Sequence, residues 1–472
     1  MRLSDETREK LVEHILESDE YALRLHREET RLVSEAVWDP GLMRRLSQDP
    51  LLFTHLLLGF KPTDYQRELL RCPSKRILVR WPRQSGKTKC LAIKALWHAV
   101  FHADTTTLII APSQRQSMIL SDVIHSLIDR IPERIRRANI KRTRRTVIYL
   151  KNRSRIVSLP NSENLLRGYT AHLVIADEAA FFRNDEAIFQ HVLTPMLATT
   201  DGAMIVSSTP WGKQSMFYAF NMDPDWTKLH ITWREAEHAG VYTPDFVRQI
   251  QKTSETRPVT YRMEYEAEFV EDHDTWLTQD ILAKSVDHDL DYQPFNKWQE
   301  GHFYLGIDLG ERVDHSAIAA LKRSGDSLLL VHMHQFPLGT SLASVIGYAK
   351  VLHDTWHSIH AVHVDNTKHG DYIIQHIIEA GVPETKGVTF TQKSKQEMAQ
   401  ILKKRMTEGT LRIPYDRTLL DELNTQRYTL TKTGRIALDH PPGTHDDRFW
   451  ALALAAHAAE HPTPSRPTAK TT

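Results

Sequence analysis

The sequence predicts an α/β protein with two domains in tandem. Its 472 residues are more than one compact hydrophobic core usually contains. Between about residues 56 and 270, short apolar runs alternate with helical segments, and a second α/β block follows between about residues 301 and 460. Short, continuous, β-branched runs are typical of strands buried on both faces of a parallel sheet. We therefore expect two α/β units joined by a connector.

The segments outside these two units have different patterns. Residues 1–55 are charged, with apolar residues at helical spacing, and predict an N-terminal helical extension; those residues are Leu11, Ile15, Leu16, Tyr21 and Leu23. Residues 271–300 are acidic and aromatic without clear periodicity, so we interpret them as the linker. The proline-containing tail, residues 461–472, cannot form a core and is expected to be disordered.

Composition excludes several classes of protein. Lys and Arg (60) nearly balance Asp and Glu (59), so any contact with nucleic acid must come from local patches. Two cysteines exclude a disulfide framework and a cysteine zinc site, and they fit a reducing compartment. The N-terminus has no apolar signal core and no segment is apolar for long enough to cross a bilayer. We expect a soluble intracellular protein without membrane contact.

A phosphate-binding loop follows the first expected strand, residues 76–79. The motif is Pro82-Arg83-Gln84-Ser85-Gly86-Lys87-Thr88, and a helix is expected over residues 91–100. Backbone N–H groups of Gln84, Ser85 and Gly86 at a helix N-terminus would cradle phosphate oxygens. Lys87 would reach the β/γ-phosphates, and the Thr88 hydroxyl would hold Mg²⁺. The plainer alternative is a helix N-terminus with a solvated lysine.

A second motif makes ATP binding the simpler interpretation. The expected strand at residues 172–176 ends in Asp177, which could coordinate Mg²⁺, and Glu178, which could polarise the attacking water. Thr209, after the expected strand at residues 203–206, is a candidate sensor of the γ-phosphate, although a plain turn is the alternative. Gln66, beside Tyr65, is a weaker candidate for reading adenine.

The second unit carries acids at the ends of its expected strands. Asp308 and Asp365 each end an apolar run, and Asp446 and Asp447 precede the final helix. A carboxylate among apolar neighbours is costly unless it binds a cation. Such acids could gather around two Mg²⁺ or Mn²⁺ ions for phosphodiester cleavage, although each alone could be a turn or a helix cap. The order of three strands, a helix and a strand predicts an RNase H-like fold.

Taken in order, these motifs resemble one family, the large terminase subunits of tailed bacteriophages and related viruses. The resemblance covers about residues 56–460. It depends on the phosphate loop above and on Ile175-Ala176-Asp177-Glu178-Ala179, Ser208-Thr209-Pro210, Gly306-Ile307-Asp308 and His445-Asp446-Asp447. It implies an ASCE-type, RecA-like P-loop ATPase domain over residues 56–270 and an RNase H-like nuclease domain over residues 301–460.

The resemblance also implies roles for individual residues. Arg83 would be the arginine of the phosphate loop, and Glu178 the catalytic glutamate. Arg167 would be an arginine finger offered to a neighbouring subunit, a contribution worth several orders of magnitude in rate. The nuclease acids would be Asp308, Asp365 and Asp447, with Asp446 as the less certain partner.

The function implied is ATP-driven translocation of viral double-stranded DNA into procapsids, with metal-dependent cutting of concatemers. Expected partners are the portal protein, the small terminase subunit and further copies in a ring, expected to be a pentamer, docked on the procapsid in the host cytoplasm. A dense basic run is a candidate contact for DNA or a neighbouring subunit: Arg130, Arg134, Arg136, Arg137, Lys141, Arg142, Arg144 and Arg145. Two alternatives stay open: a repair or helicase-type ATPase fused to a nuclease, and a protein whose nuclease block is inert.

Overall fold

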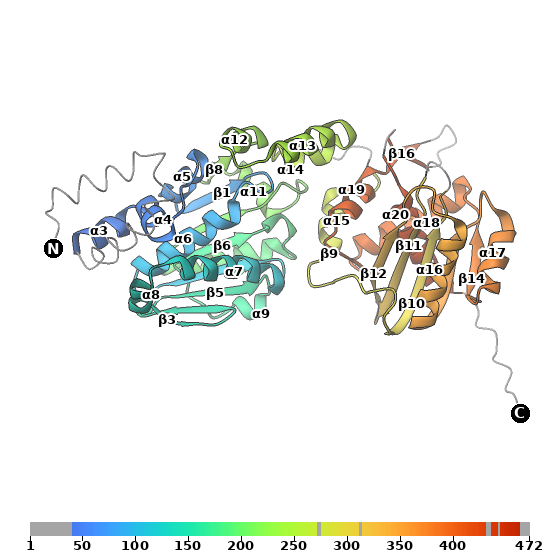
Figure 1. Cartoon of the computed structure of the whole chain (residues 1–472), viewed down its shortest axis with the longest axis horizontal. Coiled ribbons are helices and arrows are strands. Elements are labelled where there is room, and N and C mark those ends of the chain that lie inside the picture. Colours follow the sequence, from blue (N-terminus) through green and yellow to red (C-terminus); the bar gives the residue numbers. More distant parts are fainter. Residues whose placement is uncertain (1–39, 271–274, 311–313, 431–435, 442–443, 463–472) are drawn as a thin grey trace, which may run out of the picture.

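The computed structural model describes residues 40–270, 275–310, 314–430, 436–441 and 444–462. The apolar face expected within residues 1–39 and the tail beyond residue 462 lie outside this part of the chain. Two α/β lobes lie side by side, with the N-terminal one carrying the blue-to-green elements and the C-terminal one the yellow-to-red elements (Figure 1). Within the described residues, no helix has both the length and the apolar character needed to cross a membrane.

The first sheet has eight strands in the order β3-β4-β5-β2-β6-β7-β1-β8. Their bounds are β1 (Arg76–Arg80), β2 (Thr106–Ala111), β3 (Ile140–Thr143), β4 (Val147–Leu150), β5 (Arg155–Pro160), β6 (Leu173–Asp177), β7 (Ala203–Ser207) and β8 (Thr227–His230). Neighbouring strands pair in parallel along the part of the sheet that runs β5-β2-β6-β7-β1-β8. At the other edge, β3 pairs antiparallel with β4, and β4 pairs antiparallel with β5. The parallel core confirms the predicted RecA-like fold, and the antiparallel edge was not predicted.

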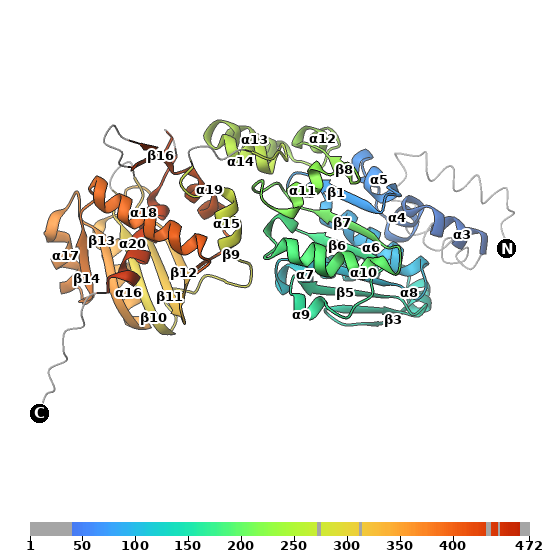
Figure 2. The ribbon, with the colours of Figure 1, turned by 180° about the vertical axis from the view of Figure 1, so that it is seen from behind.

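Helices cover both faces of this sheet (Figures 1 and 2). They are α3 (Pro40–Gln48), α4 (Pro50–Leu58), α5 (Asp64–Arg71), α6 (Lys87–Phe101), α7 (Gln114–Arg130), α8 (Glu133–Asn139), α9 (Glu163–Leu166), η1 (Ala179–Phe181), η2 (Ala187–Leu193), α10 (Thr194–Ala198), α11 (Met216–Met222), α12 (Trp233–His238), α13 (Pro244–Thr256) and α14 (Pro258–Glu264). Side-chain caps fix several starts; Ser113 accepts from the N–H of Gln116 at the start of α7.

The second sheet has seven strands in the order β14-β13-β10-β11-β12-β15-β9. Their bounds are β9 (Val286–Asp287), β10 (Gln299–Asp308), β11 (Ala317–Ser324), β12 (Ser327–Gln335), β13 (Trp356–Asp365), β14 (Thr385–Val388) and β15 (Leu411–Pro414). A separate hairpin joins β16 (Arg427–Leu430) to β17 (Ile436–Asp439). Strands β10, β11 and β12 are antiparallel neighbours, and β13 and β14 add in parallel beside β10. This order confirms the RNase H-like fold.

The helices of the second lobe are α15 (Gln279–Ser285), α16 (Leu342–Thr355), α17 (Gly370–Glu379), α18 (Gln392–Thr407), α19 (Arg417–Thr425) and α20 (Asp447–Glu460). Helix α20 packs directly on the sheet at Gly306. A Cβ atom placed there would lie 2.0 Å from the carbonyl oxygen of Ala451 and 2.3 Å from the N atom of Ala455. Only glycine allows the helix and β10 to approach this closely.

Apolar packing continues from one lobe into the other. One cluster of buried residues includes Phe181 and Trp211 of the first lobe and Leu282 and Val286 of the segment expected as the linker. Within that segment α15 and β9 are formed, and β9 pairs with β15 of the second sheet. The Trp211 indole donates to the Gln279 carbonyl at 2.7 Å, so the junction is packed and hydrogen-bonded.

Candidate functional site

The phosphate loop is held from behind by α5. The Tyr65 hydroxyl and the Gln66 side-chain NH₂ both donate to the Ser85 carbonyl, at 2.9 and 3.0 Å. Gly86 has φ +87°, and a Cβ there would lie 2.6 Å from Nε2 of Gln66. Helix α6 then begins at Lys87, so the loop and the N-terminus of α6 form one concave backbone surface, the arrangement that binds phosphate.

The two acids at the end of β6 face this loop. The Lys87 ammonium lies 3.9 Å from Oε1 of Glu178. Strands β6 and β7 pair in register at Asp177 and Ser207. The hydroxyl groups at the end of β7 and directly after it therefore reach the two acids. Ser207 donates to Asp177 at 2.5 Å, and Ser208 donates to Glu178 at 3.2 Å. The structure thus brings together Lys87, Asp177 and Glu178, as predicted.

Charge and burial give the two acids different proton affinities. Burial raises the pKa of Asp177, and the neighbouring Glu178 charge raises it further, although Lys87 opposes both. Burial also acts against ionised Glu178, but the positive charges of Lys87 and then Arg417 outweigh it, so the pKa of Glu178 lies below its ordinary value. Glu178 is also a non-glycine residue at φ +53°, a strained conformation of the kind found at functional sites.

Three other predicted residues lie in the phosphate loop, at the start of α6 and after β7. Gln84 adopts φ +56° and its side chain is exposed, whereas Thr88 lies in the first turn of α6. The Thr209 hydroxyl is buried and has no hydrogen-bond partner among the described residues. Buried polar atoms are normally paired, so this hydroxyl could meet a ligand group, and the sensor role of Thr209 stays a prediction.

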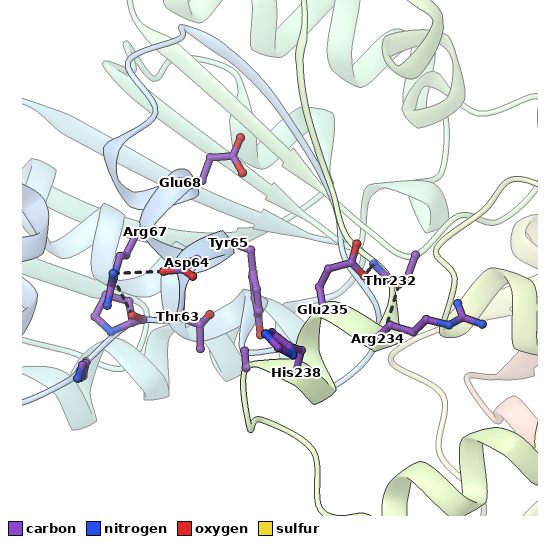
Figure 3. Close-up of a pocket in the computed structure, with 12 residues that line it drawn as sticks. Thr63, Asp64, Tyr65, Arg67, Glu68, Thr232, Arg234, Glu235 and His238 are labelled. Atoms are coloured by element: carbon purple, nitrogen blue, oxygen red, sulfur yellow. Dashed lines mark hydrogen bonds and ion pairs between the residues drawn. The ribbon is translucent and has the colours of Figure 1, made fainter. Parts of the chain in front are cut away.

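A cavity of about 880 Å³ opens beside Tyr65, between α5 and α12. Figure 3 shows Thr63, Asp64 and Tyr65 on one wall and Thr232, Glu235 and His238 on the other. Gln66 does not line it: its side-chain oxygen accepts from the N–H of Thr63 at 3.1 Å while its NH₂ group holds Ser85. Gln66 therefore supports the phosphate loop, and the side chains of Tyr65 and its neighbours are those open to a ligand.

The two predicted arginines occupy different positions. Arg83, with 45% of its side chain exposed, lies with Nε 3.8 Å from Oε2 of Glu264. Arg167 follows α9, is 67% exposed, and pairs with Glu163 at 2.9 Å. Arg83 therefore belongs to the phosphate loop itself, whereas Arg167 lies on the outer surface.

The predicted nuclease acids gather at one end of the second sheet. Strands β10 and β13 pair in register at Ile307 and Val364, which sets Asp308 and Asp365 side by side. Asp447 opens α20 and is buried, and Gln335 donates to it at 3.1 Å. Burial raises the pKa of Asp308 well above its ordinary value, and the charges of Asp365, Asp447 and Asp446 add to the effect. This group of carboxylates carries an electrostatic cost that a bound cation would remove.

Asp446 differs from Asp447 in its hydrogen bonds. One carboxylate oxygen of Asp446 accepts from Gln426 at 2.9 Å and from the Trp450 indole at 2.7 Å. That oxygen holds the start of α20, and one oxygen of Asp447 is likewise occupied by Gln335.

The ligand atoms of these acids do not form a compact group of three. Among the described residues, only Glu397, His457 and His461 form a group of three whose ligand atoms all lie within 4.8 Å of one another, and they lie at the far end of α20. Asp308, Asp365 and Asp447 do not form such a group.

Sequence comparisons find similarity to large terminase subunits. Residues 79–284 match the family model described as "Terminase large subunit, T4likevirus-type, N-terminal". Proteins named "Terminase, large subunit" from Thermus virus P23-45 and Thermus phage G20c are each 25% identical over 471 residues, covering 88% of this chain and 90% of theirs. The chain is related to the large terminase subunits.

Solved structures of large terminase domains are also similar to parts of this chain. The ATPase domain of the Thermus phage P74-26 large terminase is 24% identical, with a TM-score of 0.40 over 46% of this chain and 97% of that one. The nuclease of the phage G20c large terminase is 20% identical, with a TM-score of 0.35 over 39% of this chain and 98% of that one.

Sequence reasoning about this terminase relative missed three buried charges: Glu264, Arg417 and Glu422. Glu264 contacts Arg83 and Arg417, and Oε1 of Glu422 accepts from the N–H of Arg448 at 2.5 Å, beside the nuclease acids. None of the three lies in a motif, and their partners are far away in the sequence. A charged residue at an apolar helical position was the one available signal, for Glu422 between Leu420 and Leu423.

Proposed function

We propose that the chain hydrolyses ATP to drive double-stranded viral DNA into a procapsid and cuts that DNA with a metal-dependent nuclease. The observation that carries the proposal is the presence, in one chain, of a lysine facing a paired Asp177–Glu178 and of a separate group of buried aspartates. The relationship to large terminase subunits supports the same pairing of activities.

In the first site, ATP with Mg²⁺ supplies the phosphoryl group and neutralises its charge. Backbone N–H groups of residues 84–87 would bind the phosphates, with Lys87 at the terminal ones. Thr88 and Asp177 would hold the ion, and Thr209 would contact the terminal phosphate. Glu178, ionised at neutral pH, would orient the attacking water and accept its proton. The cavity beside Tyr65 has room for a base.

In the second site, two Mg²⁺ or Mn²⁺ ions supply the Lewis acidity for phosphodiester cleavage. Asp308, Asp365 and Asp447 would hold them, with Asp446 as a further ligand. The donor set is all carboxylate, the chemistry these hard cations prefer.

Arg167, on the outer surface, would reach the ATP site of a neighbouring copy.

We further propose the partners of a packaging motor. They are the portal protein, the small terminase subunit and other copies of the chain in a ring, expected to be a pentamer, on the procapsid in the host cytoplasm. The basic run, exposed over α8 and β3, is a candidate contact surface for DNA.

Two substitutions in the full chain test the two activities separately. Glu178→Gln should abolish ATP hydrolysis and retain ADP binding, and Asp308→Ala should abolish Mn²⁺-dependent cleavage of duplex DNA and retain hydrolysis. Matched controls are Glu133→Gln and Asp354→Asn, which change exposed acids paired with Arg137 and Lys350. Full cleavage by Asp308→Ala would refute the nuclease assignment.

Two further readouts separate the alternatives. Unwinding of a labelled duplex by the chain alone would favour a helicase-type ATPase. Absence of any Mn²⁺-dependent rise in the thermal midpoint, together with absence of cleavage, would favour an inert second domain.

A further inference from the structure

A buried carboxylate joins the phosphate loop to the second lobe. Glu264, the last residue of α14, has 3% of its side chain exposed and ion-pairs with Arg417. Its other neighbour is Arg83 of the phosphate loop, whose Nε lies 3.8 Å away and whose N–H donates to the Glu264 carbonyl at 3.2 Å. One glutamate thus lies between two arginines, one from each lobe.

The contacts of Arg417 extend toward the first lobe. Arg417 is the first residue of α19, with 17% of its side chain exposed, and its positive charge acts on Glu178 as well as on Glu264. Its guanidinium lies 5.5 Å from the centre of the Tyr415 ring, within cation–π distance. Tyr415 in turn packs edge-on against Phe181, three residues beyond Glu178. The second lobe therefore supplies a cation to the rim of the ATP site.

Burying the charges of Glu264 and Arg417 costs free energy, so each charge depends on its partner. Placing ions out of water is unfavourable by several kcal/mol for each ion unless a partner compensates it. Removal of Arg417 would leave Glu264 with Arg83 as its remaining cation, and Arg83 would be drawn toward Glu264 and away from bound phosphate. A substitution of Arg417 in the second lobe would then change the position of Arg83 in the phosphate loop.

The opposite end of α19 contacts the nuclease acids. Glu422 accepts from the N–H of Arg448, the residue that follows Asp447, and Gln426 directly after the helix donates to Asp446 at 2.9 Å. Asn424 donates to the Leu277 carbonyl at 3.1 Å, which fixes the helix to the segment that connects the lobes. A single helix of nine residues, with the residue that follows it, therefore links the neighbours of both candidate sites.

We propose that Arg417 is a positioning residue for ATP hydrolysis, supplied by the nuclease lobe, and that α19 couples the ATP site to the nuclease acids. The proposal rests on the proposed ATPase and nuclease activities. It acts through Glu264, which sets the place of Arg83. Neither residue needs to touch the nucleotide.

The test uses Arg417→Met in the full chain, with Arg405→Met as the matched control. Arg405 is buried to a similar degree, 15% exposed, and pairs with Glu460 far from the ATP site. We expect Arg417→Met to lower kcat for ATP by roughly ten-fold or more with KM changed by less than about three-fold, because positioning acts on the transition state. Arg417→Lys should restore part of kcat, and Arg405→Met should leave it unchanged.

Two more measurements separate positioning from general damage. Glu264→Gln combined with Arg417→Met should lose less kcat than the two single effects multiplied, because no buried charge is then left without its partner. A non-hydrolysable ATP analogue should change the rate of Mn²⁺-dependent DNA cleavage by the unchanged chain, and this response should disappear in Arg417→Met.

The outcomes have distinct meanings. Unaltered kcat in Arg417→Met, or an equal loss in Arg405→Met, would overturn the positioning role while leaving the proposed function intact. Cleavage that ignores the analogue in the unchanged chain would overturn the coupling through α19. Absence of ATP hydrolysis by the unchanged chain would overturn the proposed function itself, and this proposal with it.

Discussion

Substitution of Gly86 by alanine probes the geometry of the phosphate loop. The left-handed conformation at φ +87° costs a residue with a Cβ about 1–2 kcal/mol. The added Cβ would also lie 2.6 Å from Nε2 of Gln66, so the amide must leave the Ser85 carbonyl, at a further cost of about 0.5–1.5 kcal/mol for the hydrogen bond. The expected destabilisation is therefore about 1.5–3.5 kcal/mol.

Gly240→Ala separates the two contributions. Gly240 lies at φ +69° in the same lobe, with no atom within 4 Å of the added Cβ, so it carries the backbone cost of about 1–2 kcal/mol and no clash. Urea unfolding followed by tryptophan fluorescence gives the stabilities, and titration with ADP gives the affinities. We expect Gly86→Ala to unfold at lower urea than Gly240→Ala and to bind ADP about ten-fold more weakly, a loss of about 1.4 kcal/mol. Equal midpoints and equal affinities in the two variants would refute the reasoning.

Three further predictions concern the acids and the outer arginine. Asp308→Asn should raise the thermal midpoint of the metal-free chain at neutral pH while removing cleavage, because burial and then Asp365 and Asp447 make an ionised Asp308 unfavourable; a lower midpoint would contradict this. Burial raises the pKa of Glu422 from 4.5 to about 8, so the folded chain holds a proton that the unfolded chain releases. This proton contributes fully to the stability of the folded chain below about pH 4.5, and the contribution is lost as the pH rises toward 8. Urea titrations across this pH range should show that the free energy of unfolding falls less steeply with pH in Glu422→Gln than in the unchanged chain. Identical slopes in the two proteins would exclude the raised pKa of Glu422. Arg167→Ala should lose ATPase activity alone and regain part of it when mixed with Glu178→Gln chains, as expected if the arginine acts on a neighbouring copy; mixtures without recovery would argue against it.

The parts predicted from the sequence are those with a local signal. Strands β1 and β6 are short apolar runs, and each lies within a residue or two of its predicted bounds. Convergence of Asp308 and Asp365 could be predicted because adjacent parallel strands end at the same edge of a sheet.

The parts that were missed lack such a signal. Strand β3 is half-exposed or exposed along its length and carries Lys141 and Arg142, so its sequence resembles a solvated basic segment more than a strand. Helix α15 and strand β9 lie in a stretch without periodicity, because β9 is only two residues long and pairs at the edge of the sheet. Tertiary pairing overrides local preference in both cases.

The contact between Glu264 and Arg417 could not be predicted for a different reason. The two residues lie in separate lobes, and each belongs to an otherwise ordinary amphipathic helix. The ion pair forms only when the two lobes pack together, and no spacing rule relates its members.

The close approach of α20 to β10 at Gly306 has a consequence for how the nuclease acids could drift over evolution. Asp308 lies two residues beyond Gly306 on the strand, and Asp447 lies one turn before Ala451 on the helix. A methyl group at position 306 would act as a wedge, lifting the N-terminal end of α20 and carrying Asp447 away from Asp308. The separation of two charged groups is thereby set by a residue that has no side chain, and selection on the chemistry of the acids would act on position 306 as well.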